Sequence, residues 1–358
     1  MEKNFTKDGL ILLNKSKGVS SFWAINHLKR VIKAKKVGHA GTLDPMAEGL
    51  MIVMINEATK FSDNLMKKDK EYYVEMELGY KTDTYDLEGT VVAKYDSEIN
   101  ISDSEIIQAV NSFKGKIKQV PPMYSAIKIE GQKLYDLARK GIEVERAERN
   151  VEISEIREIK VMRPDKSSEN VQNIKISFYA KVSSGTYIRS LVYDIGEKLG
   201  VFATMTRLVR TKIGRFEIED AITLEKAKAE IDKLKNLMEG KTENESFWAT
   251  KNDSAIRAEK IREIVCFVEI EYVLDYYGIN VSNVKYGKLK NGMTVIDTFK
   301  KFENISKEAS KGANVRENQK FKIYVRNKNT NVREFKGIVK IVSIRGDRIY
   351  LKRDKYFL

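Results

Sequence analysis

The sequence predicts an α+β protein that ends in a small β-rich module, and three observations support this fold class. Strand-like and helix-like apolar patterns follow one another without the regular rhythm of βαβ units. A polar stretch without periodicity, residues 239–246, interrupts the apolar pattern. Beyond it, short apolar clusters are separated by Gly and Asn, which is typical of short strands. At 358 residues with 42% apolar content, the chain favours two domains over one.

The first elements are a strand and a helix. Residues 9–14 form an apolar run typical of a buried strand, and residues 15–18 form a turn. Either Ser20 or Ser21 can cap the helix that follows. Its apolar residues are expected to share one side: Trp23, Ile25, Leu28 and Ile32. Its last turn is rich in lysine, which the helix dipole favours.

In the middle of the chain, strand-like and helix-like apolar patterns alternate. Residues 71–79 are strand-like, and residues 102–105 open a helix whose apolar face carries Ile106, Val110 and Phe113. Strict alternation over residues 174–182 predicts a half-buried strand. A helix then carries apolar residues at helical spacing and ends at Gly200.

These patterns divide the chain into a first domain over residues 1–238, a linker over residues 239–263 and a second domain over residues 264–358. In the last part, short strands are expected around one apolar cluster: Ile338, Val339, Ile341, Val342 and Ile344.

The net charge of +14 is distributed unevenly. Residues 281–358 carry 20 Lys/Arg and 7 Asp/Glu, and the remainder is almost balanced. A basic region interleaved with aromatics favours nucleic acid over a merely solvated lysine-rich face. The single cysteine, Cys266, excludes an intrachain disulfide and suits a reducing compartment, so a cytoplasmic location is expected. Apolar runs are too short to span a membrane, and two histidines without paired ligands argue against a metal site.

One acidic residue, Asp44, ends a cationic strip. Residues 9–43 contain seven Lys/Arg and no Asp or Glu, and Asp44 follows in the turn formed by residues 38–45. A carboxylate placed where phosphates bind would repel the ligand unless it performs chemistry on it. In an isolated Leu-Asp-Pro sequence, the aspartate more often caps a turn. Whether Asp44 is catalytic therefore depends on the motifs elsewhere in the chain.

Several separated motifs supply the context of Asp44: Lys15–Ser21, Gly38–Pro45, Val120–Lys128, Ser184–Ser190 and Leu208–Thr211. In this order over residues 9–216, the chain resembles bacterial tRNA pseudouridine synthases of the TruB type. The resemblance implies a pseudouridine synthase domain with a mixed, largely antiparallel sheet, an RNA-clasping insertion at about residues 119–150, and a C-terminal PUA-like RNA-binding domain.

The reaction that this resemblance implies is isomerisation of uridine 55 in the T-loop of tRNA to pseudouridine. The N-glycosidic bond breaks, the uracil turns, and a C–C glycosidic bond forms without net redox change, so no cofactor is expected. Asp44 would be the catalytic carboxylate. Its target, which is the uracil ring, the sugar carbon C1′ or the proton on C2′, stays open, as does the role of Glu48. The expected partner is the tRNA T-arm, with a monomeric enzyme that requires no protein partner.

Further site residues follow from the same resemblance. Arg189 would pair with Asp44, because a buried carboxylate needs a cation; alternatively it is a surface arginine at a helix start. Tyr187 would lie in the same pocket. Base flipping requires a surface on which the extruded base stacks and a residue that fills the space it leaves. The resemblance assigns the first role to Tyr72 and the second to His39. Tyr73 would point to the opposite face of the strand. Leu208 and Lys15 complete the substrate-binding set. Core packing is the ordinary alternative for the tyrosines and for Leu208.

Two other functions remain open. A guide-dependent pseudouridine synthase would share the catalytic motifs but would act in a complex with guide RNA. A non-catalytic RNA chaperone would need the basic surface but not Asp44.

Overall fold

The computed structural model describes residues 5, 7–129, 131–164, 174–239, 259–274, 276–299, 301–302, 315–327 and 329–357. It divides into two compact units. The first comprises residues 1–5, 11–53 and 62–266, and the second comprises residues 6–10, 54–61 and 267–358. Most of the expected linker, residues 239–263, lies outside the described residues. Among the helices that the structure describes, none has the length and apolar character that crossing a bilayer requires.

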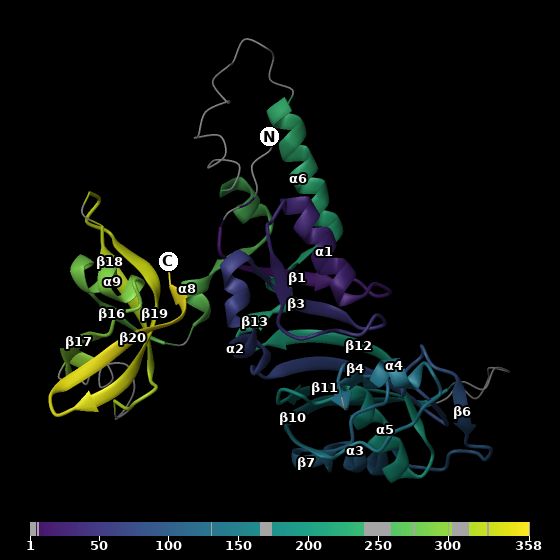
Figure 1. Ribbon diagram of the computed structural model, residues 1–358. Helices are drawn as coiled ribbons and strands as arrows, with labels where there is room; N and C mark the ends of the chain where they lie inside the picture. Colours follow the sequence, from purple (N-terminus) through teal and green to yellow (C-terminus); the bar gives the residue numbers. More distant parts are fainter. Residues whose placement is uncertain are drawn as a thin grey trace. The chain divides into compact units, whose positions relative to one another are not determined.

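A mixed sheet organises the first unit (Figure 1). Its strand order is β14-β1-β3-β12-β4-β11-β10-β7. The bounds are β1 Gly9–Lys15, β3 Glu48–Ile55, β4 Lys70–Leu78, β7 Gly115–Gln119, β10 Arg149–Met162, β11 Lys175–Val182, β12 Ala203–Ile213 and β14 Ile222–Thr223. The pairs β1–β14 and β3–β12 are parallel, whereas β12–β4, β4–β11, β11–β10 and β10–β7 are antiparallel. The predicted α+β class is therefore confirmed.

Helices flank this sheet. The helix α1 (Ser21–Ile32) packs against α6 (Leu224–Glu239), and α5 (Ile188–Leu199) packs against β12 and against α3 (Asp103–Asn111). The predicted caps are confirmed: Ser20 caps α1, Ser102 and Glu105 form a capping box on α3, and Gly200 ends α5 in the left-handed conformation. Phe113 lies beyond the end of α3 at Asn111.

One prediction about α1 was wrong. Trp23 does not share the buried side of the helix, because 44% of its surface is exposed while Ile25, Leu28 and Ile32 are buried. The reason is geometric: residues two positions apart on an α-helix lie about 200° apart around its axis. The apolar residue that joins the buried side is Ala24.

The second unit is β-rich, as expected. Its sheet has the order β16-β18-β19-β20-β17, with bounds Tyr277–Asn280, Lys320–Arg326, Arg333–Arg345, Arg348–Phe357 and Val295–Thr298. The helix α9 (Asn283–Lys290) packs against three of these strands. The predicted cluster at residues 338–344 lies on a single long strand, β19, rather than on several short ones. Val339 and Ile341 point into the core of this unit, whereas Val342 is exposed.

Candidate active site

The turn that carries Asp44 is held from beneath by Arg210. This arginine is 1% exposed, and its guanidinium donates to the carbonyls of Leu50 (2.7 Å), Gly41 (3.2 Å) and Thr42 (3.4 Å). The close approach depends on Gly49, whose φ is +107° and where an added Cβ would lie 2.4 Å from the carbonyl oxygen of Arg210. Strands β3 and β12 can therefore pair directly beneath the turn.

Two further side chains fasten the same turn to α1 and its preceding loop. The Ser21 hydroxyl donates to the Leu43 carbonyl (2.7 Å) and accepts from the Leu43 N–H (2.8 Å). The buried Lys15 ammonium donates to the carbonyls of Ser16 (3.1 Å), Val19 (2.8 Å) and Pro45 (3.3 Å). Burial lowers the pKa of Lys15 to about 8, although the negative charges of Asp44 and Glu48 oppose this shift. Lys15 is thus a brace of the turn in this structure.

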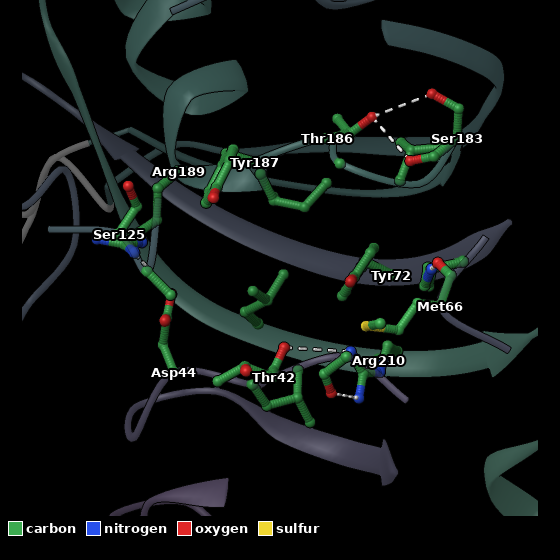
Figure 2. Close-up of a pocket in the computed structure, with 18 residues that line it drawn as sticks. Thr42, Asp44, Met66, Tyr72, Ser125, Ser183, Thr186, Tyr187, Arg189 and Arg210 are labelled. Atoms are coloured by element: carbon green, nitrogen blue, oxygen red, sulfur yellow. Dashed lines mark hydrogen bonds and ion pairs between the residues drawn. The ribbon is translucent and has the colours of Figure 1, made fainter. Parts of the chain in front are cut away.

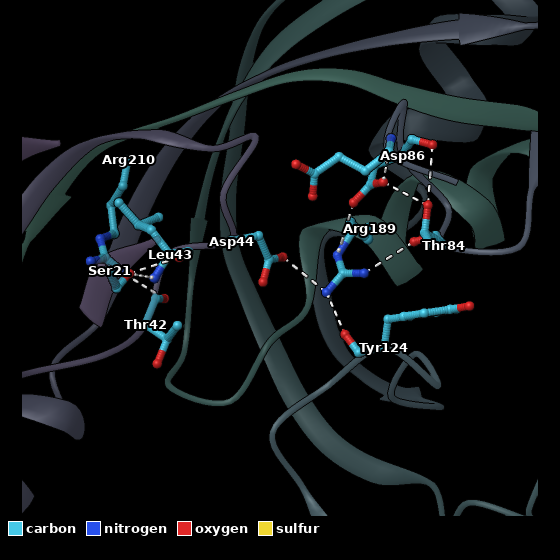
Figure 3. Close-up of polar contacts among 10 residues, drawn as sticks. Ser21, Thr42, Leu43, Asp44, Thr84, Asp86, Tyr124, Arg189 and Arg210 are labelled. Carbon is cyan, nitrogen blue, oxygen red and sulfur yellow. Dashed lines mark hydrogen bonds and ion pairs between the residues drawn. The ribbon is translucent and has the colours of Figure 1, made fainter. Parts of the chain in front are cut away.

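An ion pair sets the direction of Asp44. Its Oδ2 lies 2.9 Å from Nη2 of Arg189, whose side chain is 5% exposed, whereas that of Asp44 is 37% exposed (Figure 3). The guanidinium also donates to the carbonyls of Thr84 (3.1 Å) and Tyr124 (2.8 Å). The alternative of a surface arginine is excluded by this burial. Arg189 therefore presents the Asp44 carboxylate to solvent from a fixed, buried position.

A second carboxylate lies behind Arg189. Asp86 is 2% exposed, and its Oδ2 is 3.6 Å from Nε of Arg189. Its Oδ1 accepts hydrogen bonds from the Thr84 hydroxyl (2.6 Å) and the Glu88 N–H (3.0 Å). Burial raises the pKa of Asp86, and these hydrogen bonds and the Arg189 charge oppose that shift. Arg189 thus contacts two carboxylates, one exposed and one buried.

Asp44 lies at one end of a cavity of about 370 Å³. Tyr72, Tyr187, Arg189 and Leu208 line it together with Asp44, so five of the predicted site residues meet there. Figure 2 shows Asp44 and Arg189 at one end of the cavity, and Met66 and Ser183 at the other. Lys70 also lines this cavity, and burial lowers its pKa to about 8.

The aromatic walls are fixed by the sheet and by a backbone clasp. Tyr72 is buried on the cavity side of β4, while Tyr73 faces the other way and packs on Tyr179 at 5.2 Å between ring centroids. The side chain of Gln119 accepts from the Tyr187 N–H (2.8 Å) and donates to its carbonyl (3.0 Å). Burial raises the pKa of Tyr187, so its phenol stays protonated at neutral pH.

Two predicted residues lie outside the cavity lining. Lys15 braces the turn, as described above, and His39 belongs to β2 (Val37–His39). The Nδ1 atom of His39 is buried without a hydrogen-bond partner in the described part of the chain, and burial lowers the pKa of the imidazole. Glu48 also lies outside the lining, and its Oε1 pairs with Nε of Arg207 at 2.8 Å.

Sequence reasoning missed three residues of this site: Asp86, Gln119 and Arg210. Arg210 falls within a recognised motif, but arginines are seldom fully buried and so it received no role. Asp86 lies in a loop without a motif, and Gln119 acts through the backbone of a residue 68 positions away. Pairing across such distances leaves no local signal.

The arrangement suits chemistry on a planar ring. An accessible carboxylate, aimed by a buried guanidinium, adjoins two aromatic side chains and an aliphatic one. Such a carboxylate can act as a nucleophile or take up a proton. Among the described residues, no three His, Cys, Asp or Glu side chains are gathered as metal ligands would be.

Comparisons with known proteins give a consistent result. Residues 29–188 match the family model "TruB family pseudouridylate synthase (N terminal domain)", and residues 189–258 match "tRNA pseudouridylate synthase B C-terminal domain". The chain is 49% identical over 212 residues to tRNA pseudouridine synthase B of Fusobacterium nucleatum, covering 59% of this chain and 70% of that protein. It is 46% identical over 291 residues to the protein of the same name from Clostridium perfringens, covering 81% and 85%.

Solved structures agree at the level of the fold. A chain in the crystal structure of a Cbf5-Nop10-Gar1 complex superposes with a TM-score of 0.62 at 22% identity, covering 98% of this chain and 85% of that chain. A chain in an archaeal box H/ACA sRNP Nop10-Cbf5 complex superposes with a TM-score of 0.55 at 20% identity, covering 98% and 86%.

Proposed function

The chain belongs to the TruB family of pseudouridylate synthases, and from this membership we propose that it converts uridine 55 in the T-loop of tRNA to pseudouridine. The motifs that indicated the family are thereby confirmed, whereas the position of the target uridine is our proposal. The relatives at 46–49% identity bear the name tRNA pseudouridine synthase B, which supports tRNA as the substrate.

The observation that supports the proposal most strongly is the Asp44–Arg189 ion pair at the end of the cavity. Isomerisation breaks the N1–C1′ bond and forms the C5–C1′ bond, while C5 loses a proton and N1 gains one. The carboxylate acts at this glycosidic bond. Three routes share the same requirement for Asp44: attack on the uracil ring, attack on C1′, or removal of the C2′ proton.

Other residues of the cavity would hold the uracil during this rearrangement. Tyr72 offers a buried aromatic face for stacking, and Leu208 an apolar surface. Tyr187, a protonated phenol, would lie near the base and could donate or receive a hydrogen bond. His39 would enter the space that the extruded base leaves. Lys15 would support substrate binding through the turn that it braces.

The substrate partner in this proposal is the T-arm of tRNA, bound by a monomeric cytoplasmic enzyme without a protein partner. The excess of Lys/Arg over residues 281–358 supports contacts with stem phosphates. Such contacts position the RNA without reading its sequence. Selectivity would then come from loop shape and from the extruded base.

Tritium release tests this proposal directly. A T-arm stem–loop labelled at C5 of the target uridine is incubated with the intact chain, with Asp44→Asn and with Glu48→Gln. Glu48→Gln is the matched control, because Glu48 is an acidic residue four positions after Asp44 that does not line the cavity. We expect release from the intact chain and from Glu48→Gln, and no release from Asp44→Asn at a tRNA affinity within a few-fold of wild type.

Other results would redirect the assignment. Release from Asp44→Asn, or a loss of binding that matches its loss of activity, would contradict the role of Asp44. Tight binding by the intact chain without any release would favour a guide-dependent synthase or an RNA chaperone. Restored release after addition of a guide RNA complex would then separate these two.

A further inference from the structure

Two adjacent aromatic side chains at the start of α1 have no place in the core. Phe22 is 74% exposed, the largest value among the large hydrophobic side chains of the described residues, and Trp23 is 44% exposed. The His27 ring, one turn along, lies 4.9 Å from the Trp23 ring between centroids. This contact orients the indole without burying it.

This aromatic pair is rigidly connected to the catalytic turn. Both hydrogen bonds of the Ser21 hydroxyl reach the backbone of Leu43, so the two chain segments are locked together at these positions (Figure 3). Phe22 directly follows one member of this bridge, and Asp44 directly follows the other. The Ser20 side chain also caps the Trp23 N–H at 3.1 Å. The position of this pair relative to Asp44 is therefore fixed.

The surroundings favour a nucleic acid as the occupant. No acidic residue occurs between Gly9 and Leu43, and Lys17, Arg30 and Lys35 are exposed. The loop before the helix is polar and exposed, which is typical of the rim around a nucleic-acid contact rather than of the apolar core of a protein interface. Aromatic faces among cations are typical of surfaces that stack unpaired bases.

We propose that Phe22 and Trp23 form a stacking surface for an unpaired RNA base next to the nucleotide that enters the cavity. This proposal rests on the proposed function, because it takes the target nucleotide to lie at Asp44. Stacking on an aromatic side chain contributes enough that its removal should weaken RNA binding by about 5- to 150-fold. The chemical step should change little, because the Asp44–Arg189 pair is untouched.

The test compares Phe22→Ala and Trp23→Ala in the full-length chain with Tyr272→Ala, an exposed aromatic of the second unit, as the matched control. Each variant is measured for Kd and KM with a T-arm stem–loop, and with two stem–loops that carry an abasic site on either side of the target uridine. We expect a higher Kd and KM for both α1 variants, an unchanged control, and kcat within about threefold. On the RNA that lacks the stacked base, wild type and variants should bind alike.

A second readout follows the indole itself. The chain has two tryptophans, so Trp248→Phe leaves Trp23 as the sole tryptophan, which is excited selectively at the red edge of the absorption band. Titration with the stem–loop should quench its fluorescence, and the abasic RNA should quench it less.

The inference would fail if both α1 variants bound like wild type, or if they lost the same affinity for intact and abasic RNA. Normal turnover with unchanged binding would refute the stacking surface and leave the proposed function intact. Quenching and weakened binding without turnover on any RNA would support the stacking surface and refute the proposed function.

Discussion

Replacing Arg189 with methionine should destabilise the fold and inactivate the site for one physical reason. The guanidinium lies 3.6 Å from the buried Asp86, and it also orients Asp44. Without it, Asp86 keeps its hydrogen bonds from Thr84 and Glu88 but loses the arginine charge beside it. Removing one partner of a buried ion pair typically costs about 3–5 kcal/mol of unfolding free energy. Asp44 would also lose the group that orients its carboxylate, which should lower kcat by about 10²-fold or more.

The pH dependence of this loss follows from Asp86. Burial already raises the pKa of Asp86, and Arg189 opposes that shift. In Arg189→Met the folded-state pKa should rise further, while in the unfolded chain it stays near ~3.9. Above that pH the folded variant binds a proton that the unfolded chain has released. The unfolding free energy of the variant should therefore fall, relative to wild type, as pH increases from 4 to 7.

Urea denaturation of wild type, Arg189→Met and Arg189→Met/Asp86→Asn at pH 4 and pH 7 measures both effects. The double variant removes the buried charge, so at pH 7 its unfolding free energy should exceed that of Arg189→Met by about 1–3 kcal/mol. Its difference from wild type should change little between the two pH values. Tritium release should stay low in both, because Asp44 remains without its partner. A double variant no more stable than Arg189→Met would refute the role of the buried charge. The same would follow if Arg189→Met lost equal unfolding free energy, relative to wild type, at both pH values.

Three further predictions concern the turn and the second unit. Ser21→Ala removes both hydrogen bonds to Leu43, so it should cost about 1–3 kcal/mol in urea denaturation and lower kcat more than it raises KM. Because the pKa of Lys15 is lowered to about 8 in the folded chain, wild type should gain unfolding free energy relative to Lys15→Met as pH rises from 8 towards 10.5; a constant difference would contradict this. If the exposed Arg345 and Arg348 each contact a phosphate, changing both to Gln should reduce the slope of log Kd against log salt by about 1–2, and an unchanged slope would remove them from the RNA interface.

Much of the framework could be predicted because its signals are local. The caps at Ser20, Ser102 and Gly200 depend on residues within one helical turn, and the structure confirms all three. The strand before α5 follows from strict alternation. The pairing of Asp44 with Arg189 was predicted from the resemblance, and the 2.9 Å separation in the structure agrees with it.

The rest of the site depends on contacts across the sheet, which leave no periodic trace. Arg210 and Leu50 are 160 positions apart, yet strand pairing between β12 and β3 brings them together. Asp86 meets Arg189 because the loop that follows β5 (Tyr80–Thr82) packs on α5, where the rings of Tyr85 and Tyr193 stack. Trp23 is exposed for a different reason: the helical angle places it about 200° from the buried Ile25 around the axis of α1.

The cationic strip and its single carboxylate pose an electrostatic problem that the buried groups resolve. Asp44 and Asp86 share Arg189, whereas Arg210 donates only to carbonyl oxygens in the contacts described above. The mostly protonated Lys15 lies close enough for its pKa to respond to Asp44. Glu48 and Glu88 also act on Lys15, so the charges around Asp44 nearly balance, and Asp44 itself is paired with Arg189. The attraction for phosphate therefore comes from the Lys and Arg residues of the cationic strip, while the pairing with Arg189 reduces the repulsion that the Asp44 carboxylate exerts on the RNA.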